Sequence, residues 1–261
     1  MNYADLHSHV AWEIDDGMPS KEDAIISLTN AKKDGVAAIC STPHVVPGQT
    51  DKEMLEIIMN RQNDLAKLAA PIGIHIYRGA EMFMNYNFIE ALDEHLYLTI
   101  NGTKYMLCEF DVRKDISEVE DAEDFFYEIK MKGMIPLLAH VERYFNHGLD
   151  IDQIDDWIDM GVVMQVNRTS LLGFHGKTIQ KNAWYLIENG YASIVCTDTH
   201  RSSGHRVEIL SDVEEELTKR VGKENTELLL WKNPLKILND MEVDSLEVRK
   251  KESKKFFKFF K

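Results

Sequence analysis

The stretch Asp5-Leu6-His7-Ser8-His9 stands at the end of the first β-rich run of the chain and decides how the fold is interpreted. In an extended strand, residues i and i+2 point to the same side, so the imidazoles of His7 and His9 can reach one metal ion. A His-x-His pair alone indicates a metal site only moderately. Its meaning depends on what stands at the ends of the other runs.

Short β-rich runs alternate with longer amphipathic segments along the rest of the chain. Several runs are continuously apolar, as are strands that helices cover on both faces. The predicted strands are 2–6, 36–41, 74–80, 104–109, 134–139, 162–167 and 192–197. Strands separated by helices in this way predict an α/β fold, arranged as a distorted seven-stranded parallel β/α (TIM-like) barrel.

Three capping patterns, each with a hydroxyl oxygen three residues before a carboxylate, predict where helices begin. These patterns are Ser20 with Asp23, Thr50 with Glu53, and Ser117 with Glu120. Four glycines end helical segments shortly before a strand, where the C′ position favours positive φ. They are Gly35, Gly133, Gly161 and Gly190. After Asp198 the pattern predicts helices over 213–221, 224–231 and 234–238 and no further strand.

Composition and charge narrow the class of protein. The 261 residues carry a formal charge of −14, with 44% hydrophobic and 28% charged residues. We expect one large domain over 1–248, and the negative charge argues against nucleic acid as a partner. No run approaches the roughly 20 apolar residues of a membrane-spanning helix, and no signal-peptide pattern precedes Asp5. We therefore expect a cytoplasmic protein.

Residues 249–261 form a compositionally separate tail with seven Lys or Arg, one Glu and four Phe. Basic and aromatic side chains together favour a peripheral contact with an anionic membrane surface or with an acidic partner. The alternative is a frayed end whose lysines keep the phenylalanines soluble.

The three cysteines, Cys40, Cys108 and Cys196, are an odd number and include no Cys-x-x-Cys pair, so they imply no disulfide framework. A cysteine-based tyrosine phosphatase requires an arginine six positions after its nucleophile. Positions 46, 114 and 202 are Val, Lys and Ser. That mechanism is excluded.

Metal-ligand residue types stand at the ends of most of the predicted strands. They are His44, Glu81, Glu109, His140, Asp198 and His200, with Asp16 added from the loop after the first strand. Only the sixth strand, which ends at Asn167, lacks one. In parallel β/α folds the carboxyl ends of the strands meet at one mouth. Five histidines and four carboxylates gathered there indicate a site for divalent metal ions, because the carboxylates would otherwise repel one another.

The set DLHSH, DDG, STPH, GAE, the Glu of CEF, AHVER and TDTH resembles the PHP (polymerase and histidinol phosphatase) superfamily. More narrowly, it is similar to the bacterial PHP-type protein-tyrosine phosphatases of capsule and exopolysaccharide operons. The resemblance runs from Asp5 to about Leu238. It implies a PHP-type barrel and metal-dependent hydrolysis of phosphomonoesters.

The resemblance also implies a trinuclear site. His7, His9, Glu81 and Asp198 would hold the first metal ion, and Glu81 would bridge to a second that Glu109 and His140 also hold. Asp16, His44 and His200 would hold the third. Imidazole and carboxylate ligands suit manganese, iron or zinc, of which manganese is favoured.

Arg143, three residues after His140, is the first candidate for binding phosphate oxygens, because a guanidinium offers paired donors. A second arginine is expected after the last ligand histidine, and Arg206 is favoured over Arg201. Asp5 is a candidate for orienting a ligand imidazole. An ordinary strand-edge hydrogen bond is the alternative for Asp5. The general acid is unassigned, with His205 as a candidate.

The resemblance implies a phosphotyrosine protein as substrate, namely a membrane-associated tyrosine autokinase that controls polysaccharide production, and it implies a homo-oligomer. A small-molecule phosphatase such as histidinol-phosphate phosphatase is the alternative, because the metal chemistry is shared and only the pocket rim differs. An amidohydrolase-type barrel also begins with His-x-His. It usually bridges two metals with a lysine, which leaves Asp16 and His44 without a role.

Overall fold

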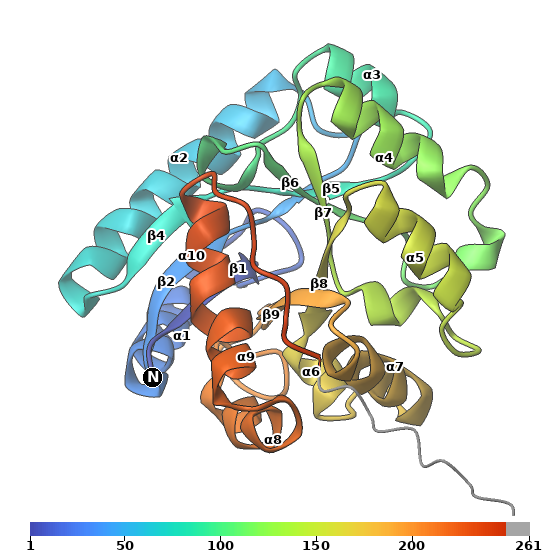
Figure 1. Cartoon of the computed structure of the whole chain (residues 1–261). Coiled ribbons are helices and arrows are strands. Elements are labelled where there is room, and N and C mark those ends of the chain that lie inside the picture. Colours follow the sequence, from blue (N-terminus) through green and yellow to red (C-terminus); the bar gives the residue numbers. More distant parts are fainter. Residues whose placement is uncertain (249–261) are drawn as a thin grey trace, which may run out of the picture.

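The computed structural model describes residues 1–248 and shows an α/β fold with parallel sheets (Figure 1). The predicted tail, 249–261, lies outside the described residues. The strands are β1 Tyr3–Ser8, β2 Val36–Ser41, β3 His44–Val45, β4 His75–Arg78, β5 Glu81–Phe83, β6 Tyr105–Glu109, β7 Ile135–Leu138, β8 Val163–Asn167 and β9 Ala192–Cys196. Each of the seven predicted strands therefore overlaps a strand of the structure.

Helices follow most of the strands and lie outside the sheets (Figure 1). They are α1 Lys21–Asp34, α2 Lys52–Ala69, α3 Phe88–Asp93, α4 Ala122–Met131, α5 Ile151–Asp159, α6 Arg168–Leu171, α7 Lys177–Glu188, α8 Ser211–Val221, α9 Lys223–Glu227 and α10 Asn233–Leu238. Short helical turns connect some of them, among them η4 Val141–Tyr144. Of the helices over residues 1–248, none combines the length and the apolar character needed to cross a membrane.

The strands form two sheets, with the orders β1-β2-β4 and β3-β5-β6-β7-β8-β9. The division falls where two chain segments pass from one sheet to the other. Pro43 lies between β2 and β3 and has no N–H to donate to a neighbouring strand. Gly79 lies between β4 and β5. A Cβ at Gly79 would lie 3.0 Å from Cys40 Sγ, so there is little room for a side chain there. The predicted single strand over 74–80 is consequently two strands.

The first and last strands meet only briefly. A bridge pairs Ser8 with Thr199, and the Asp198 and His9 amides donate to the carbonyls of His7 and Thr199 at 2.9 and 2.8 Å. A continuous ladder around a seven-stranded ring is therefore not confirmed. The contact nevertheless places the ends of β1 and β9 side by side.

Two of the three predicted helix starts lie at different residues. Ser20 is the N-cap of α1 and accepts from the Asp23 amide, as predicted. Asp51, rather than Thr50, caps α2, because the Thr50 hydroxyl accepts from the Val46 amide. The pair Ser117 and Glu120 does not start a helix. A capping box of Asp115 with Glu118 closes a short turn there, and α4 begins later.

The four predicted glycines all have positive φ, which only glycine adopts without strain. Gly35 is the left-handed C-cap of α1, with φ of 103°. The chain after Asp198 forms helices and no further strand within residues 1–248, as predicted. Cys40, Cys108 and Cys196 are buried and free.

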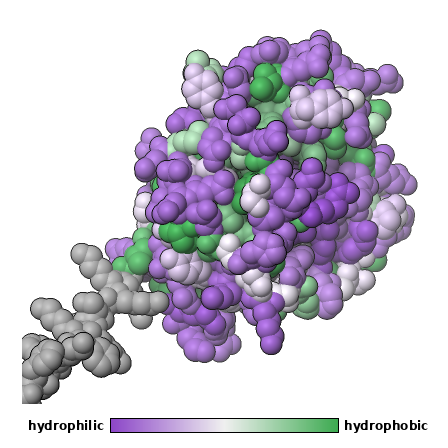
Figure 2. Space-filling model, turned by 90° about the vertical axis from the view of Figure 1, so that its right-hand side faces the viewer, coloured by the Kyte–Doolittle hydropathy of each residue, from purple (hydrophilic) through white to green (hydrophobic). Residues whose placement is uncertain are grey.

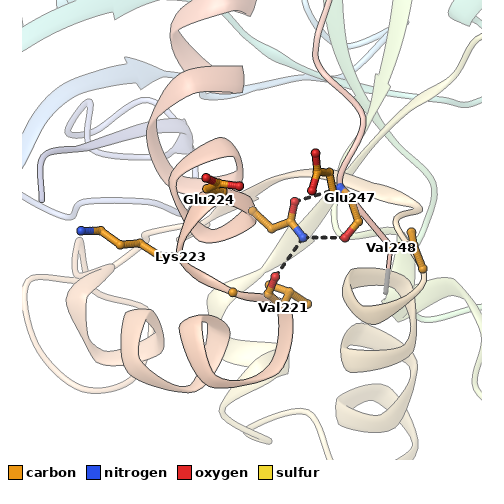
Figure 3. Close-up of a pocket in the computed structure, with 7 residues that line it drawn as sticks. Val221, Lys223, Glu224, Glu247 and Val248 are labelled. Carbon is orange, nitrogen blue, oxygen red and sulfur yellow. Dashed lines mark hydrogen bonds between the residues drawn. The ribbon is translucent and has the colours of Figure 1, made fainter. Parts of the chain in front are cut away.

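Two asparagines hold the segment 241–248 at the amino ends of the strands. Asn225 donates to the Glu247 carbonyl and accepts from its amide, both at 2.9 Å, and also donates to Val221. Asn233 binds Asp244 in the same two-bond manner and donates to the Ser193 carbonyl. Figure 3 shows the hollow of about 440 Å³ beside the first of these asparagine contacts, lined by Val221, Lys223 and Glu247. No imidazole lines this hollow.

Candidate metal centre

All nine predicted ligands converge at the carboxyl ends of the strands. Their ligand atoms form four groups in which every atom lies within 4.8 Å of the others. The groups are His9, Asp16, His44 and His200; His7, His9 and Asp198; His7, Glu81 and His140; and His44, Glu81 and Glu109. The strand-end pattern in the sequence therefore locates the cluster.

The Nε2 atoms of His7 and His9 face each other at 3.3 Å. Each ring bonds through Nδ1 to an acceptor, His7 to Gln165 Oε1 at 3.0 Å and His9 to Asp15 Oδ2 at 2.7 Å. This network places the proton of each neutral ring on Nδ1, which leaves a lone pair on each Nε2. Two unprotonated nitrogens that point at the same place are the arrangement a cation requires.

Carboxylate oxygens complete this convergence. Glu81 Oε2 lies 3.2 Å from both the His7 and the His9 Nε2 atoms, and Asp198 Oδ1 lies 3.6 and 3.7 Å from them. These four electron-pair donors would repel one another unless a proton or a metal ion lies between them. The residues present therefore fit a divalent ion.

Glu81 also faces a second set of donors. Its Oε1 lies 3.1 Å from His140 Nε2, and its Oε2 lies 3.1 Å from His44 Nδ1. Glu109 stands 3.4 Å from His140 and 3.2 Å from His44. The His140 Nδ1 atom is buried without a hydrogen-bond partner. Glu81 is thus central to the cluster, with an oxygen on each side.

Asp16, His44 and His200 lie nearer the surface. Asp16 Oδ1 is 3.4 Å from His44 Nε2 and 3.3 Å from His200 Nε2. The His200 Nδ1 faces the Asp198 carbonyl at 3.0 Å, which leaves Nε2 as the ligand atom. Because 65% of the Asp16 side chain is exposed, this group is the most accessible to solvent.

The ionisation of the cluster follows from burial and mutual attraction. Burial alone would raise the pKa of Glu81 and Asp198, but the neighbouring histidines hold both pKa values well below their usual range. Burial lowers the pKa of His7, and Glu81 with Asp198 outweighs it and raises that pKa to about 9. The His7 ring therefore carries a second proton near neutral pH in the absence of metal. A divalent ion would displace this proton, so metal binding releases protons.

Two of the ligands have left-handed backbone, which is strained for His140. His140 and Asp198 have φ of 33° and 54°, in the left-handed region that side chains other than Gly, Asn and Asp seldom adopt. Both residues follow directly after strands, β7 and β9. Both side chains belong to the ligand cluster.

Three supporting residues were not identified from the sequence. Asp15 fixes the His9 ring and accepts from the His44 amide, and Gln165 binds both the His7 ring and the His140 amide. Asn167 donates to Asp198 Oδ2 at 2.9 Å. Asn167 thus gives the sixth predicted strand a role beside the ligands. The position of Asn167 at the end of a predicted strand is the feature of the sequence from which this role could be predicted.

Asp5 does not contact either imidazole, which corrects its predicted role. Its carboxylate accepts from the backbone amides of His7 and Thr197 and from the Thr197 hydroxyl. Glu208, whose pKa is raised by burial and by Asp5, bonds to Ser8 at 2.6 Å. Asp5 therefore joins the backbones of β1 and the segment after β9, in keeping with the strand-edge alternative.

A pocket of about 310 Å³ opens above the cluster, and both Arg143 and Arg206 line it. Arg206 Nη2 lies 2.7 Å from Asp198 Oδ1, and Arg143 Nη1 lies 3.5 Å from Asp198 Oδ2. Arg201 does not line the pocket. Its guanidinium donates to the carbonyls of Asp16, Gly17 and His200 and so holds the loop in place.

The pocket rim also contains residues that the sequence did not indicate. Phe83 and Val112 are apolar, and Arg113 forms two bonds with Asp111 at 2.8 Å each. His205 does not line the pocket; its ring stacks on Phe174 with the centroids 3.9 Å apart. The geometry thus gives His205 no contact with the cluster.

Comparisons with known proteins show the family and the fold. The family model described as capsular polysaccharide synthesis, CpsB/CapC, matches residues 3–239. Tyrosine-protein phosphatase CpsB of Streptococcus pneumoniae is 28% identical over 243 residues, which cover 90% of this chain and 98% of that protein. Tyrosine-protein phosphatase YwqE of Bacillus subtilis is 28% identical over 234 residues, which cover 87% and 91%.

A solved structure supports the fold. It is described as YwqE from Bacillus subtilis and CpsB from Streptococcus pneumoniae, unique metal-dependent tyrosine phosphatases. It superposes with a TM-score of 0.81 and 24% identity, over 93% of this chain and 96% of that chain. A TatD-like protein from Archaeoglobus fulgidus shares the fold more distantly, with a TM-score of 0.52 and 11% identity.

Proposed function

The chain belongs to the CpsB/CapC family of capsular polysaccharide synthesis, and we propose that it is a metal-dependent phosphatase of phosphotyrosine in proteins. The observation that carries this proposal is the convergence of the His7 and His9 Nε2 lone pairs with Glu81 and Asp198. The two arginines beside this cluster provide the matching charge for a phosphate.

The proposed site holds three divalent ions, with manganese favoured over iron and zinc. The ligand set is the one the sequence predicts: His7, His9, Asp16, His44, Glu81, Glu109, His140, Asp198 and His200. Bound ions would supply a nucleophile near neutral pH and neutralise charge on the phosphoryl oxygens. Asp15 and Gln165 fix the tautomers of His9 and His7, which keeps their Nε2 atoms available.

Arg143 and Arg206 act directly on the substrate in this proposal. Both line the pocket, and both now face Asp198, so each guanidinium is already held toward the cluster. A phosphoryl group placed there would accept paired N–H donors from Arg143. Such contacts strengthen as negative charge builds on the equatorial oxygens in the transition state.

The rim favours an aryl phosphate over an alkyl one. Phe83 and Val112 provide apolar surface at the pocket wall, where an aromatic ring attached to the phosphate would pack. A phenol leaving group, with a pKa of about 10, needs less protonation than an alkoxide. Apart from the proposed ligands, the one carboxyl group that lines the pocket within the described residues is Asp111, and its hydrogen bond from Arg113 lowers its pKa, so it is poorly suited to act as a general acid.

We further propose the setting that the sequence suggests. The protein substrate is a membrane-associated tyrosine autokinase that regulates polysaccharide production, and the phosphatase is a cytoplasmic homo-oligomer with a distorted PHP-type barrel. Residues 1–248 form its single domain. A peripheral membrane contact by residues 249–261 remains a prediction; deletion of this tail should reduce binding to anionic vesicles, and unchanged binding would exclude the contact.

The test compares three substrates. Chelator-treated protein supplied with Mn²⁺ should hydrolyse a phosphotyrosyl peptide and para-nitrophenyl phosphate far faster than histidinol phosphate. A preference for histidinol phosphate would favour the alternative of a small-molecule phosphatase and contradict the proposal. Activity that survives chelation would contradict the metal mechanism.

A further inference from the structure

A second hollow lies between α7 and the loop that follows η4. Its volume is about 530 Å³, and His147, Leu149, Lys177, Lys181, Asn182 and Tyr185 are among the residues that line it. None of these residues belongs to the proposed metal site. We call this feature the basic hollow.

The positive charge of the basic hollow lacks partners. Lys177 and Lys181 are one turn apart, so they lie on the same face of α7, and both are exposed. Within residues 1–248 neither ammonium forms an ion pair, whereas Lys67, Lys132 and Lys236 each pair with a carboxylate. Two exposed lysines beside His147 give this concave site a local positive charge in a chain whose net charge is −14.

The basic hollow is joined to the segment that carries Arg143. Asn182, which is 3% exposed, donates to the carbonyls of Glu142 at 3.3 Å and Phe145 at 2.8 Å. These bonds fix α7 against η4. His147 is four positions after Arg143, and four residues span at most about 14 Å. A phosphoryl group at Arg143 and an anion in the basic hollow are therefore within reach of one short peptide.

Both features are built on segments that begin near the carboxyl ends of the strands. η4 follows β7, and the first turn of α7, with Lys177, comes after β8, so each lies near the carboxyl ends of the strands. The surface that includes α5 and α7 is largely hydrophilic, as Figure 2 shows. A charged segment with aliphatic groups suits this site, because Leu149 and Tyr185 line the basic hollow beside its lysines.

The opposite flank of the site has the opposite charge. A hollow of about 310 Å³ between the β3–α2 loop and α3 is lined by Asp51, Glu90 and Glu94. That hollow would repel an acidic segment. An acidic substrate chain would therefore be directed toward α7.

We propose that the basic hollow binds an anionic side chain of the substrate, a carboxylate or a second phosphate, within about four residues of the phosphotyrosine. This inference rests on the proposed function and names its substrate class, which is a phosphotyrosyl peptide with neighbouring negative charge. Lys177 and Lys181 supply the charge, while Leu149 and Tyr185 contact the aliphatic part of the bound side chain.

The experiment uses the full chain with Mn²⁺ and peptides that differ only three residues from the phosphotyrosine. That position carries Glu, phosphoserine or Gln, placed before the phosphotyrosine in one series and after it in another. The wild-type chain should show kcat/KM about tenfold higher for an anionic peptide than for its Gln counterpart, through a lower KM. The Glu and phosphoserine arms identify which anion is preferred.

Lys177→Glu and Lys181→Glu should each remove this preference and leave the hydrolysis of para-nitrophenyl phosphate unchanged, because that substrate is too small to reach the basic hollow. Lys33→Glu is the matched control. Lys33 is an exposed lysine at the far end of α1, and this variant should keep the preference.

Two outcomes would overturn the inference while the proposed function stands. In the first, the wild type has the same kcat/KM for anionic and Gln peptides. In the second, the lysine variants lose as much kcat/KM on para-nitrophenyl phosphate as on the peptides. If the wild type with Mn²⁺ hydrolyses none of the phosphotyrosyl substrates, the proposed function fails, and this inference fails with it.

Discussion

The two ends of the parallel strands carry opposite kinds of polar chemistry. At the amino ends, Asn225 and Asn233 bind backbone amides and carbonyls of 241–248, so donors meet acceptors. At the carboxyl ends, Glu81 and Asp198 converge with imidazole lone pairs, so acceptors meet acceptors.

The difference shows which end serves stability and which serves chemistry. Buried polar atoms that satisfy one another stabilise the fold, whereas buried acceptors without protons are costly until a cation joins them. The strained φ of His140 and the left-handed backbone of Asp198 occur at this same end. Changes at the amino ends should therefore alter stability and spare activity, and changes at the carboxyl ends should do the reverse.

The largest effect is expected for Glu81→Gln. Glu81 faces His7, His9, His44 and His140, so losing its charge weakens every metal position around it. We expect kcat/KM to fall by about 10³ or more, which corresponds to several kcal/mol of transition-state stabilisation. The melting temperature of the chelator-treated protein should change little. Glu56→Gln, at an exposed site on α2, is the matched control, and comparable activity in the two variants would contradict the role of Glu81.

A smaller loss is expected for Arg143→Lys. Lysine keeps the charge but cannot offer two parallel donors, so kcat/KM for para-nitrophenyl phosphate should fall by about 10². Arg201→Lys should change it only a few-fold, because the Arg201 guanidinium binds loop carbonyls outside the pocket. Equal losses in the two variants would show that Arg143 acts through the fold and not on phosphate.

Asp15→Asn should weaken metal binding by about tenfold to a hundredfold. The Asp15 carboxylate holds the proton on His9 Nδ1 at 2.7 Å, and an amide can present its NH₂ group instead and reverse the tautomer. Titration of chelator-treated protein with Mn²⁺ measures the change. Asp64→Asn, at an exposed residue paired with Lys67, is the control. An unchanged affinity would mean that Asp15 only shapes its loop.

The smallest effect on activity is expected at the opposite end of the strands. Asn233→Ala leaves the Ser193 carbonyl and the Asp244 backbone without their partner, at a cost of about 1–3 kcal/mol in the free energy of unfolding. The kcat/KM should stay at the wild-type value. Asn239→Ala, which removes one bond at an exposed site, should cost less. A loss of activity at wild-type stability would contradict the separation of the two ends.

The sequence predicts the ligand cluster well because parallel strands end at the same edge. A His or carboxylate after each strand therefore gives a position in space as well as in the chain. The supporting residues Asp15 and Gln165 were missed because their partners, the rings of His9 and His7, are identified only once the loops and strands are placed. Asp5 was assigned to a ring for the same reason, although it binds backbone.

The local errors have local causes. Thr50 and Asp51 both offer a capping oxygen, and the contact between Thr50 and Val46 decides in favour of Asp51. The pattern of apolar residues over 74–80 does not reveal that β4 and β5 belong to different sheets. That division lies at Pro43, which has no N–H to donate, and at Gly79, where a side chain would contact Cys40 Sγ.

The most direct test of the account is the turnover of a phosphotyrosyl peptide by chelator-treated protein as Mn²⁺ is added back. The account predicts no measurable hydrolysis without metal and full recovery as the sites fill. It also predicts that the recovery requires less Mn²⁺ at pH 8 than at pH 6, because the ion displaces protons from rings such as His7, whose pKa is raised to about 9 by Glu81 and Asp198 in spite of burial. Full activity in the metal-free protein would contradict the account.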